Sequence, residues 1–507
     1  MNTDGPTTTL SDPPPFWARP VGVTVICALW AGFHFWIAAF LRSALVVDDS
    51  LESFHSQSLE FFYASRNPAL YDWILNGVNR IVGSSFYGAP LVNYASMLTC
   101  ALLLYALARR VIADPRLQAF SVYSLSLLWI IGFESHRILA HSQVMIALMA
   151  AAILVFWSLG ESRAVWKYLL LGALIPLGIL AKYSFALFIG AIVAAALLER
   201  VYRRVVLDPR FLLTLLVAIA PLGLFFYLAT AETQAIVDTS TGVLTGGDDA
   251  ILKVLEKLLG AFAGYGLPFA AIYALVFFVP RPARKAGAPG PNEAFLRLNR
   301  TVLLIGVVVM VAWALGPGGT QLRPRYLHCL FLTLPLFSFM VLDRYQPTRR
   351  AIRSYATILL VMAVAIGGIY LAGRLAPSET LCGSCRPSVP YRQLGKEIVQ
   401  RYGPAPVIVA PNRMLAGQYR AAVPAARAVA LDTTEYAPPP MAASRCLLIW
   451  PSTTTKQTKL AEQMAEFGKD LLPDEQITLD WWAPLLPQTR QTTFNLQELP
   501  ADAAPCR

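Results

Sequence analysis

Residues 21–40 read VGVTVICALWAGFHFWIAAF, and the acidic run DDSLE follows at residues 48–52. The first stretch contains no Lys, Arg, Asp or Glu and has the length of about 20 residues that a helix needs to cross a bilayer. It lacks the short apolar core and small-residue cleavage site of a signal peptide, so we predict an uncleaved membrane span. The acidic run therefore begins at a membrane boundary.

Further apolar runs continue along the chain to about residue 372. The 507 residues are 56% hydrophobic and only 14% charged, which excludes an ordinary soluble globular protein. We predict a polytopic α-helical membrane protein with about eleven transmembrane helices. The ten later runs lie at 87–107, 117–134, 142–160, 168–181, 183–199, 211–230, 259–280, 301–316, 326–342 and 352–372.

Basic residues gather in alternate loops, which the positive-inside rule assigns to the cytoplasm. These loops lie near 109–116, 163–167, 200–210, 281–285 and 344–353. Most of the net charge of +11 lies upstream of the tail, where it indicates topology and argues against a nucleic-acid partner. The N-terminus is then cytoplasmic, and an odd number of spans carries the tail to the outer side. We expect a transmembrane domain at 1–375, with a first outer loop at about 41–86, and an outer domain at 376–507.

The two outer parts have different patterns. In the first outer loop, apolar residues at helical spacing predict two amphipathic helices on the membrane surface, at about 51–62 and 71–81. In the tail, helical patterns alternate with short β-like runs, which is typical of a small α/β domain. The helical patterns lie at 391–402 and 458–471, and the β-like runs at 407–410, 428–431, 446–450 and 477–481.

Four of the seven cysteines, Cys382, Cys385, Cys446 and Cys506, lie in the tail. An oxidising compartment for the tail explains this distribution. Four cysteines allow three complete pairings. We predict at least one disulfide, either Cys382 to Cys385 or a link from that segment to the body of the domain.

The acidic run offers the candidate catalytic residues Asp48 and Asp49, and one helical turn further on Glu52 is a candidate substrate-binding residue. Carboxylates so close repel one another, so either a pKa rises or a divalent cation lies near Asp48 and Asp49. A partly desolvated carboxylate is a suitable general base. The alternative is a solvated acidic turn that caps the following helix.

Cationic and donor groups lie on the same predicted outer side. His136, Arg137 and His141 are packed into a short hairpin, ESHRILAHSQ at 134–143. A donor-rich hairpin beside an acidic loop suits an anionic or hydroxylated ligand, so we predict that these three residues bind substrate. Lys182 follows a run of only 14 apolar residues, about 21 Å of helix against about 30 Å of hydrocarbon. It should lie below the outer surface, where an ammonium group is a functional candidate, with Tyr183 beside it. The alternative for the hairpin residues and for Lys182 is a structural role, in which their long side chains only reach water at the membrane interface.

Arg323 and Arg325 open the tenth run from the outside, against the positive-inside bias. Arginine binds phosphate by bidentate hydrogen bonds, so these two residues are candidate phosphate ligands. Acidic partners in the tail are the alternative. The sequence contains no phosphate-cradling loop of the nucleotide kind and no zinc-finger spacing, and we assign no metal-binding residues.

Four segments in this order resemble the family 39/83-like polyprenyl-phosphate-sugar glycosyltransferases, which include protein O-mannosyltransferases and lipid A aminoarabinose transferases. They are the acidic pair 48–49, NPALYDW at 67–73, ESHR at 134–137 with the following HS at 141–142, and GILAKY at 178–183. The resemblance covers about residues 40–200 and implies the C-type glycosyltransferase fold. Asn67-Pro68 stands where the family usually has Pro-Pro, and His141 and Gln143 stand where many members have an acidic residue.

The resemblance implies a catalytic acidic residue in the first outer loop and a lipid-linked phosphosugar donor. Asp48 or Asp49 is then the base for the acceptor hydroxyl, and Lys182, Arg137 and Arg323 or Arg325 hold the phosphate. We expect an inverting transfer to an envelope glycolipid such as lipid A or its core, although another glycan or a protein are alternative acceptors. The implied location is the bacterial inner membrane, with the tail in the periplasm and membrane lipids around the spans. A flippase for an anionic polyprenyl-linked lipid, or a sugar-binding assembly factor, are the rival readings.

Overall fold

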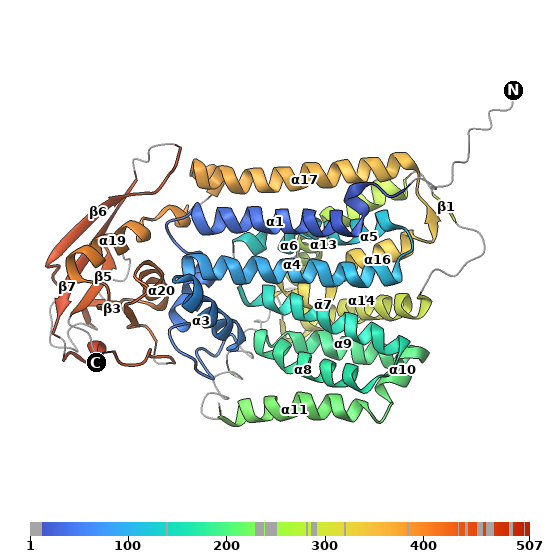
Figure 1. The fold of residues 1–507 in the computed structure, drawn as a ribbon, viewed down its shortest axis with the longest axis horizontal. Coiled ribbons are helices and arrows are strands. Elements are labelled where there is room, and N and C mark those ends of the chain that lie inside the picture. Colours follow the sequence, from blue (N-terminus) through green and yellow to red (C-terminus); the bar gives the residue numbers. More distant parts are fainter. Residues whose placement is uncertain are drawn as a thin grey trace.

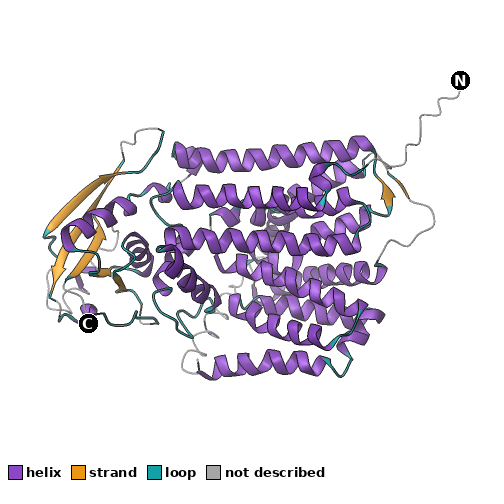
Figure 2. Cartoon of the chain, viewed as in Figure 1, coloured by secondary structure: helices purple, strands orange, loops and turns teal. Residues whose placement is uncertain are grey.

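The computed structural model describes most of the chain, and its helices and strands occupy separate regions (Figure 1, Figure 2). A bundle of roughly parallel and antiparallel helices is built from the chain up to α17 (Arg349–Leu375), and a sheet domain from the tail lies against one end of it. The described residues are 13–137, 140–228, 238, 251–279, 282–284, 292–318, 321–382, 385–433, 435–441, 445–453, 460–462, 471–485, 490–500 and 502–507.

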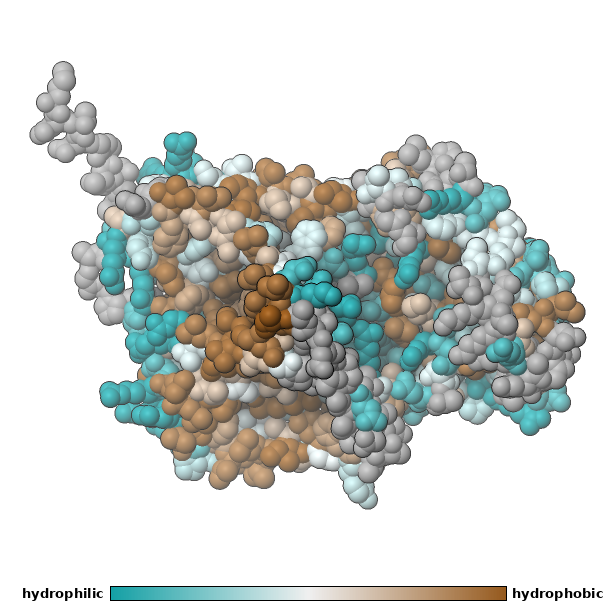
Figure 3. Space-filling view, turned by 180° about the vertical axis from the view of Figure 1, so that it is seen from behind, coloured by the Kyte–Doolittle hydropathy of each residue, from teal (hydrophilic) through white to brown (hydrophobic). Residues whose placement is uncertain are grey.

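Seven described helices are long and apolar enough to cross a membrane, and two bent helix pairs raise the number to nine. Hydrophobic residues cover the side of the bundle, and hydrophilic residues gather toward its two ends (Figure 3). This distribution is expected when lipid surrounds the middle of the bundle. The seven are α1 (Pro20–Phe40), α4 (Ser85–Val111), α7 (Ala140–Glu161), α11 (Phe211–Leu228), α13 (Ile251–Phe277), α14 (Glu293–Trp313) and α17.

The other four predicted runs also lie on helices, but in broken or shorter form. One run bends by 76° between α5 (Pro115–Tyr123) and α6 (Trp129–Gly132), with a 3-10 turn between them. Another is α9 (Phe185–Leu198), which bends by 119° into α10 (Arg200–Val206). The remaining two coincide with shorter apolar helices, so eleven complete crossings remains a prediction. These shorter elements are α8 (Val165–Ala181) and the pair α15 (His328–Phe331) and α16 (Leu334–Leu342).

The described parts of the predicted cytoplasmic loops meet at the bundle end away from the tail. There β1 (Ala283–Arg284) pairs with β2 (Tyr345–Gln346), and both lie at the right-hand end in Figure 1. Asp343 accepts the backbone N–H of Ala113 at 2.7 Å, which ties two of these loops together. The alternate basic loops therefore share one end, as the charge pattern requires.

The first outer loop forms α2 (Val47–His55) and α3 (Leu70–Val82). Two acidic residues in the first turn of α2 and a histidine in its last turn suit the helix dipole. The two predicted amphipathic helices are present. Six of the nine residues of α2 are buried, because α20 of the tail and helices α3 and α4 pack against it. The position of α2 relative to the membrane surface remains a prediction.

The tail contains a five-stranded mixed sheet in the order β4-β3-β5-β7-β6. Its β3 is parallel to β4 and β5, while β7 is antiparallel to β5 and β6. The bounds are β3 (Val407–Ala410), β4 (Arg427–Ala430), β5 (Cys446–Pro451), β6 (Glu475–Asp480) and β7 (Gln491–Leu499), with helices α19 (Tyr391–Tyr402) and α20 (Arg413–Ala422). The predicted helix at 458–471 lies largely outside the described residues.

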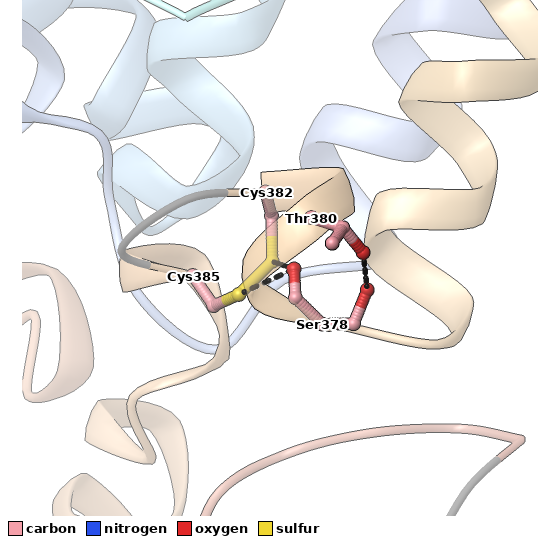
Figure 4. Close-up of a disulfide and its surroundings, with 4 residues drawn as sticks. All are labelled: Ser378, Thr380, Cys382 and Cys385. Carbon is pink, nitrogen blue, oxygen red and sulfur yellow. Dashed lines mark hydrogen bonds between the residues drawn. A yellow bond between two sulfur atoms is a disulfide. The ribbon is translucent and has the colours of Figure 1, made fainter.

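Two disulfides form in the tail, which confirms the predicted location of at least one. Cys382, the last residue of the short helix α18 (Glu379–Cys382), bonds to Cys385 beside Ser378 and Thr380 (Figure 4). Cys446 at the start of β5 bonds to Cys506. The three cysteines of the bundle are buried and free.

The tail is held on the first outer loop by close backbone packing. At Gly417 in α20, an added Cβ would lie 1.6 Å from the carbonyl oxygen of Ser50 in α2, so only glycine fits there. The Gln418 side chain bonds both backbone groups of Leu45, at 2.8 and 2.9 Å. The Gln57 side chain bonds both backbone groups of Ala428 in β4 in the same way. The tail thus fixes the position of α2.

Candidate active site

The predicted acidic and basic residues converge where α2 meets the tail-side end of the bundle. Helix α2 packs against α20 of the tail and also contacts α3 and α4. The hairpin before α7 and the corner between α8 and α9 approach from the bundle. Asp48, Glu52, His141 and Lys182, far apart in the sequence, therefore belong to one region.

Asp49 is buried and fully engaged. Its carboxylate accepts a hydrogen bond from Arg42 at 2.9 Å and another from the Asn93 amide at 3.2 Å. Tyr71 in turn donates to Asn93 at 2.9 Å. Burial raises the pKa of Asp49, Arg42 opposes the rise, and the neighbouring Asp48 adds to it. Asp49 is thus a member of a closed network of protein groups.

Asp48 lies on another side of α2 and is only half-buried. Residues four apart share one helix face, so Asp48 and Glu52 project from α2 together. Asp48 interacts electrostatically with Lys182. Of the two candidate bases, Asp48 is the more exposed.

Glu52 stands in a second buried network. Its two carboxylate oxygens lie 3.0 Å from His141 Nε2 and 3.2 Å from His55 Nδ1. Asp72 of α3 lies 3.8 Å from the same His55 nitrogen. Burial favours the neutral form of Glu52, but His141 and His55 outweigh it and hold the pKa of Glu52 well below its usual range. Burial, together with the nearby Glu52, raises the pKa of Asp72 well above its usual range.

Lys182 caps the end of α8 and is oriented by the start of α7. Its ammonium group donates to Ser142 Oγ at 2.7 Å, and His141 Nδ1 lies 3.3 Å from the carbonyl oxygen of Ala181. Helix α8 begins at Val165, three residues before the predicted run, and spans about 26 Å. Lys182 is half-buried, and its depth in the membrane remains a prediction.

Arg325 and Arg323 differ in exposure. Arg325 is half-buried, packs over the Tyr326 ring at 5.4 Å and interacts electrostatically with Lys182. Arg323 is exposed. Tyr183 is half-buried beside Lys182, and its hydroxyl has no hydrogen-bond partner among the described residues. The structure thus places Arg325, and not Arg323, in the electrostatic field of Lys182.

The hairpin residues His136 and Arg137 reach a different part of the site. His136 is buried, stacks on the His34 ring at 4.2 Å and hydrogen-bonds the Tyr94 hydroxyl at 3.0 Å. Arg137 is exposed and lies 4.0 Å from Glu134. Both residues line a small cavity together with Asp49. They are near the Asp49 network, whereas His141 belongs to the Glu52 network.

A larger cleft of about 580 Å³ opens between the first outer loop and the tail. Val47 and Ser50, which flank the two aspartates, form one wall. Asn412 and Asp432, which follow the carboxyl ends of β3 and β4, form another. Parallel strands commonly place ligand sites at this edge, and here the edge faces the N-terminal turn of α2.

Sequence reasoning misses Arg42, Asn93, His55 and Asp72. Arg42 is the first charge after the first span, and its proximity to the acidic run was a usable signal. Asp72 lies in the segment that carries the family resemblance. Asn93 is 44 residues from Asp49 inside a predicted span, and no local pattern identifies it.

A family model described as dolichyl-phosphate-mannose-protein mannosyltransferase matches residues 66–226. Two similar proteins from Rhizobium johnstonii are named lipopolysaccharide core galacturonosyltransferases RgtB and RgtA. RgtB is 26% identical over 433 residues, 84% of this chain and 86% of the relative. RgtA is 25% identical over 440 residues, 85% of this chain and 87% of the relative.

The fold is similar to that of ArnT from Cupriavidus metallidurans, solved bound to undecaprenyl phosphate. The TM-score is 0.57 at 13% identity, with 94% of this chain and 98% of ArnT covered. These comparisons confirm the predicted C-type glycosyltransferase fold and the predicted enzyme class, a membrane glycosyltransferase.

Proposed function

We propose that this membrane glycosyltransferase of the C-type fold transfers a hexuronic acid from a polyprenyl-phosphate donor to the core of an envelope lipopolysaccharide. The similarity to two lipopolysaccharide core galacturonosyltransferases over more than four fifths of the chain supports the sugar and the acceptor. The ArnT fold, solved with undecaprenyl phosphate, supports the donor lipid. The half-buried set of Asp48, Lys182 and Arg325 is the observation that carries the proposal.

Asp48 acts as the general base in this proposal. An acceptor hydroxyl attacks the anomeric carbon, the bond from that carbon to the phosphate oxygen breaks, and the proton of the hydroxyl passes to Asp48. A single displacement of this kind inverts the anomeric configuration. Asp49 is unsuited to the same role because Arg42 and Asn93 already occupy its oxygens.

Lys182 and Arg325 hold the donor phosphate and stabilise the charge that develops as it leaves. Ser142 fixes the Lys182 ammonium group, which reduces the reorganisation needed during the reaction. Tyr183 offers one more hydroxyl beside Lys182. The 580 Å³ cleft gives a polar acceptor a route to Asp48 from the tail side.

We place the protein in the bacterial inner membrane with its N-terminus in the cytoplasm and the domain from residue 376 in the periplasm. The two disulfides of the tail support an oxidising compartment. The basic loops at the opposite end of the bundle support the same orientation. The donor would then be used on the periplasmic face.

Mass spectrometry of envelope glycolipids tests the proposed function. Cells that express the wild-type protein should carry lipopolysaccharide core with one additional hexuronic acid, and cells that express Asp48→Asn at the same level should not. Identical core glycolipids in both strains would refute the acceptor. Donor-lipid movement across vesicles that persists in Asp48→Asn would favour the flippase alternative.

A further inference from the structure

We propose that Glu52, His55 and Asp72 form a binding site for one divalent first-row cation, Zn²⁺ or Mn²⁺, that joins α2 to α3. All three side chains are buried, with exposed fractions of 2%, 6% and 1%. One donor atom from each lies within 4.8 Å of the other two. The site shares no residue with the half-buried set of Asp48, Lys182 and Arg325, which we name the accessible set.

The spacing of the donor atoms suits a cation between them. His55 Nδ1 lies 3.2 Å from Glu52 Oε2 and 3.8 Å from Asp72 Oδ1. Ligands about 2.0–2.1 Å from a tetrahedral Zn²⁺ are separated from one another by about 3.3 Å. Small side-chain movements therefore bring the three atoms into coordination. Imidazole with two carboxylates suits Zn²⁺, and the carboxylates also suit Mn²⁺.

A bound cation would supply the partner that one buried carboxylate oxygen of the cluster lacks. Asp72 Oδ1 is buried and has no hydrogen-bond partner among the described residues. A buried carboxylate oxygen without a partner is costly. Arg42, a buried cation on the first outer loop, is bonded to Asp49. A bound dication would allow Glu52 and Asp72 to be ionised side by side.

Groups around the cluster fix the orientation of the proposed ligands, as outer partners of metal sites do. His141 Nε2 contacts the Glu52 oxygen that does not face His55, and its Nδ1 faces the Ala181 carbonyl oxygen. The His55 ring packs against the rings of Tyr63 and Tyr436, at 5.5 and 5.7 Å. The Glu52 and His55 side chains therefore have little freedom to turn away.

The cation would act by positioning. It would connect two turns of α2 to α3, and through His141 it would be coupled to α7 and the Lys182 corner. Asp48 lies one helical turn before Glu52, so a fixed α2 also fixes Asp48. The inference does not depend on the transferred sugar or the acceptor, because its readout is the metal itself.

Metal analysis of the full-length protein in detergent tests the site. After purification in metal-free buffer and loading with Zn²⁺ or Mn²⁺ alone, followed by removal of unbound ion, mass spectrometry of the metal should find one cation per chain. Asp72→Asn and His55→Gln should lose it. Two matched controls, the exposed Asp432→Asn and the buried His34→Gln, should keep it.

Thermal unfolding gives a second readout, and its wild-type part does not require any variant to fold. A chelator should lower the Tm of the wild-type protein, and the same ion should restore it, whereas folded Asp72→Asn should respond to neither. Wild-type protein that holds neither ion stoichiometrically after loading would overturn the proposal. Metal retention in folded Asp72→Asn and His55→Gln would also overturn it, since the ion would then bind elsewhere.

Discussion

Two groups of charged side chains stand at the tail end of the bundle, and they differ in how they are held. The Asp49 network, with Arg42 and Asn93, is buried, and each charged partner in it is bonded to another protein group. The accessible set, Asp48, Lys182 and Arg325, is half-buried, and both Asp48 and Arg325 interact electrostatically with Lys182. The two aspartates are adjacent in sequence but belong to different groups.

The difference separates structural roles from chemical ones. Breaking a buried ion pair leaves a charge that water cannot reach, so its cost appears mainly in stability. Removing a half-exposed charge is tolerated by the fold, so its cost should appear mainly in substrate binding and turnover. Measurements of stability and of turnover should therefore distinguish the Asp49 network from the accessible set.

The largest expected effect is on turnover in Asp48→Asn. Removing a general base lowers the rate by about 10²–10⁴-fold, while the Tm should change little because Asp48 is half-buried. The measurement is single-turnover transfer by purified protein from a polyprenyl-phosphate donor. Asp49→Asn is the matched comparison and should lose more stability than Asp48→Asn. Near-normal transfer by both variants and by the double variant would exclude both aspartates as the base.

The next effect is on stability in Arg42→Met. The Arg42 and Asp49 side chains are 2% and 5% exposed, and breaking such a pair costs about 3–5 kcal/mol in the free energy of unfolding. The Tm should fall accordingly. Arg413→Met is the control, because its partner Glu435 is 31% exposed and pairs of that kind contribute about 0–1 kcal/mol. An equal Tm in both variants would mean that the Asp49 network does not stabilise α2.

Much of the helical bundle could be predicted from the sequence, because lipid requires long apolar helices with satisfied backbone groups. Each of the eleven apolar runs lies on a helix in its described part. The tail was predicted less completely. Helix α20 is only ten residues long and contains Gly417, and β7 is recognised only once β5 and β6 supply its partners. The burial of α2 also depends on the tail, which a local pattern does not include.

The site was predicted as a set of residues but not as two groups. The acidic run and Lys182 were identified because charges at a membrane boundary are unusual. The distinction between Asp48 and Asp49 depends on Asn93 in α4, and the Glu52 network depends on His141 in α7. These contacts connect segments that share no local periodicity, so only the three-dimensional arrangement reveals them.

A smaller effect is expected on donor binding in Lys182→Met. A charge-assisted hydrogen bond to phosphate contributes about 1.5–3 kcal/mol, so the Kd for the donor lipid should rise by about 10–100-fold. The Tm should stay the same or rise slightly, since methionine keeps the apolar stem. Lys167→Met, at the other end of α8, is the control and should bind the donor normally. Equal affinity in Lys182→Met and the wild type would return Lys182 to a structural role.

The smallest expected effect separates Arg325 from Arg323. In the proposal Arg325 shares the donor phosphate with Lys182, so the loss of Arg325 leaves one cation in place. Arg325→Gln should therefore weaken donor binding by only a few-fold. This corresponds to about 0.5–1 kcal/mol of binding free energy, as expected for a charge pair at a partly exposed site. Arg323 is exposed, so Arg323→Gln should bind the donor as the wild type does.

Salt dependence gives a sharper test of Arg325, because screening weakens exposed charge interactions more than buried ones. The defect of Arg325→Gln should therefore be smaller at high ionic strength than at low. A larger defect in Arg323→Gln would move the second phosphate cation to that residue and remove Arg325 from the accessible set.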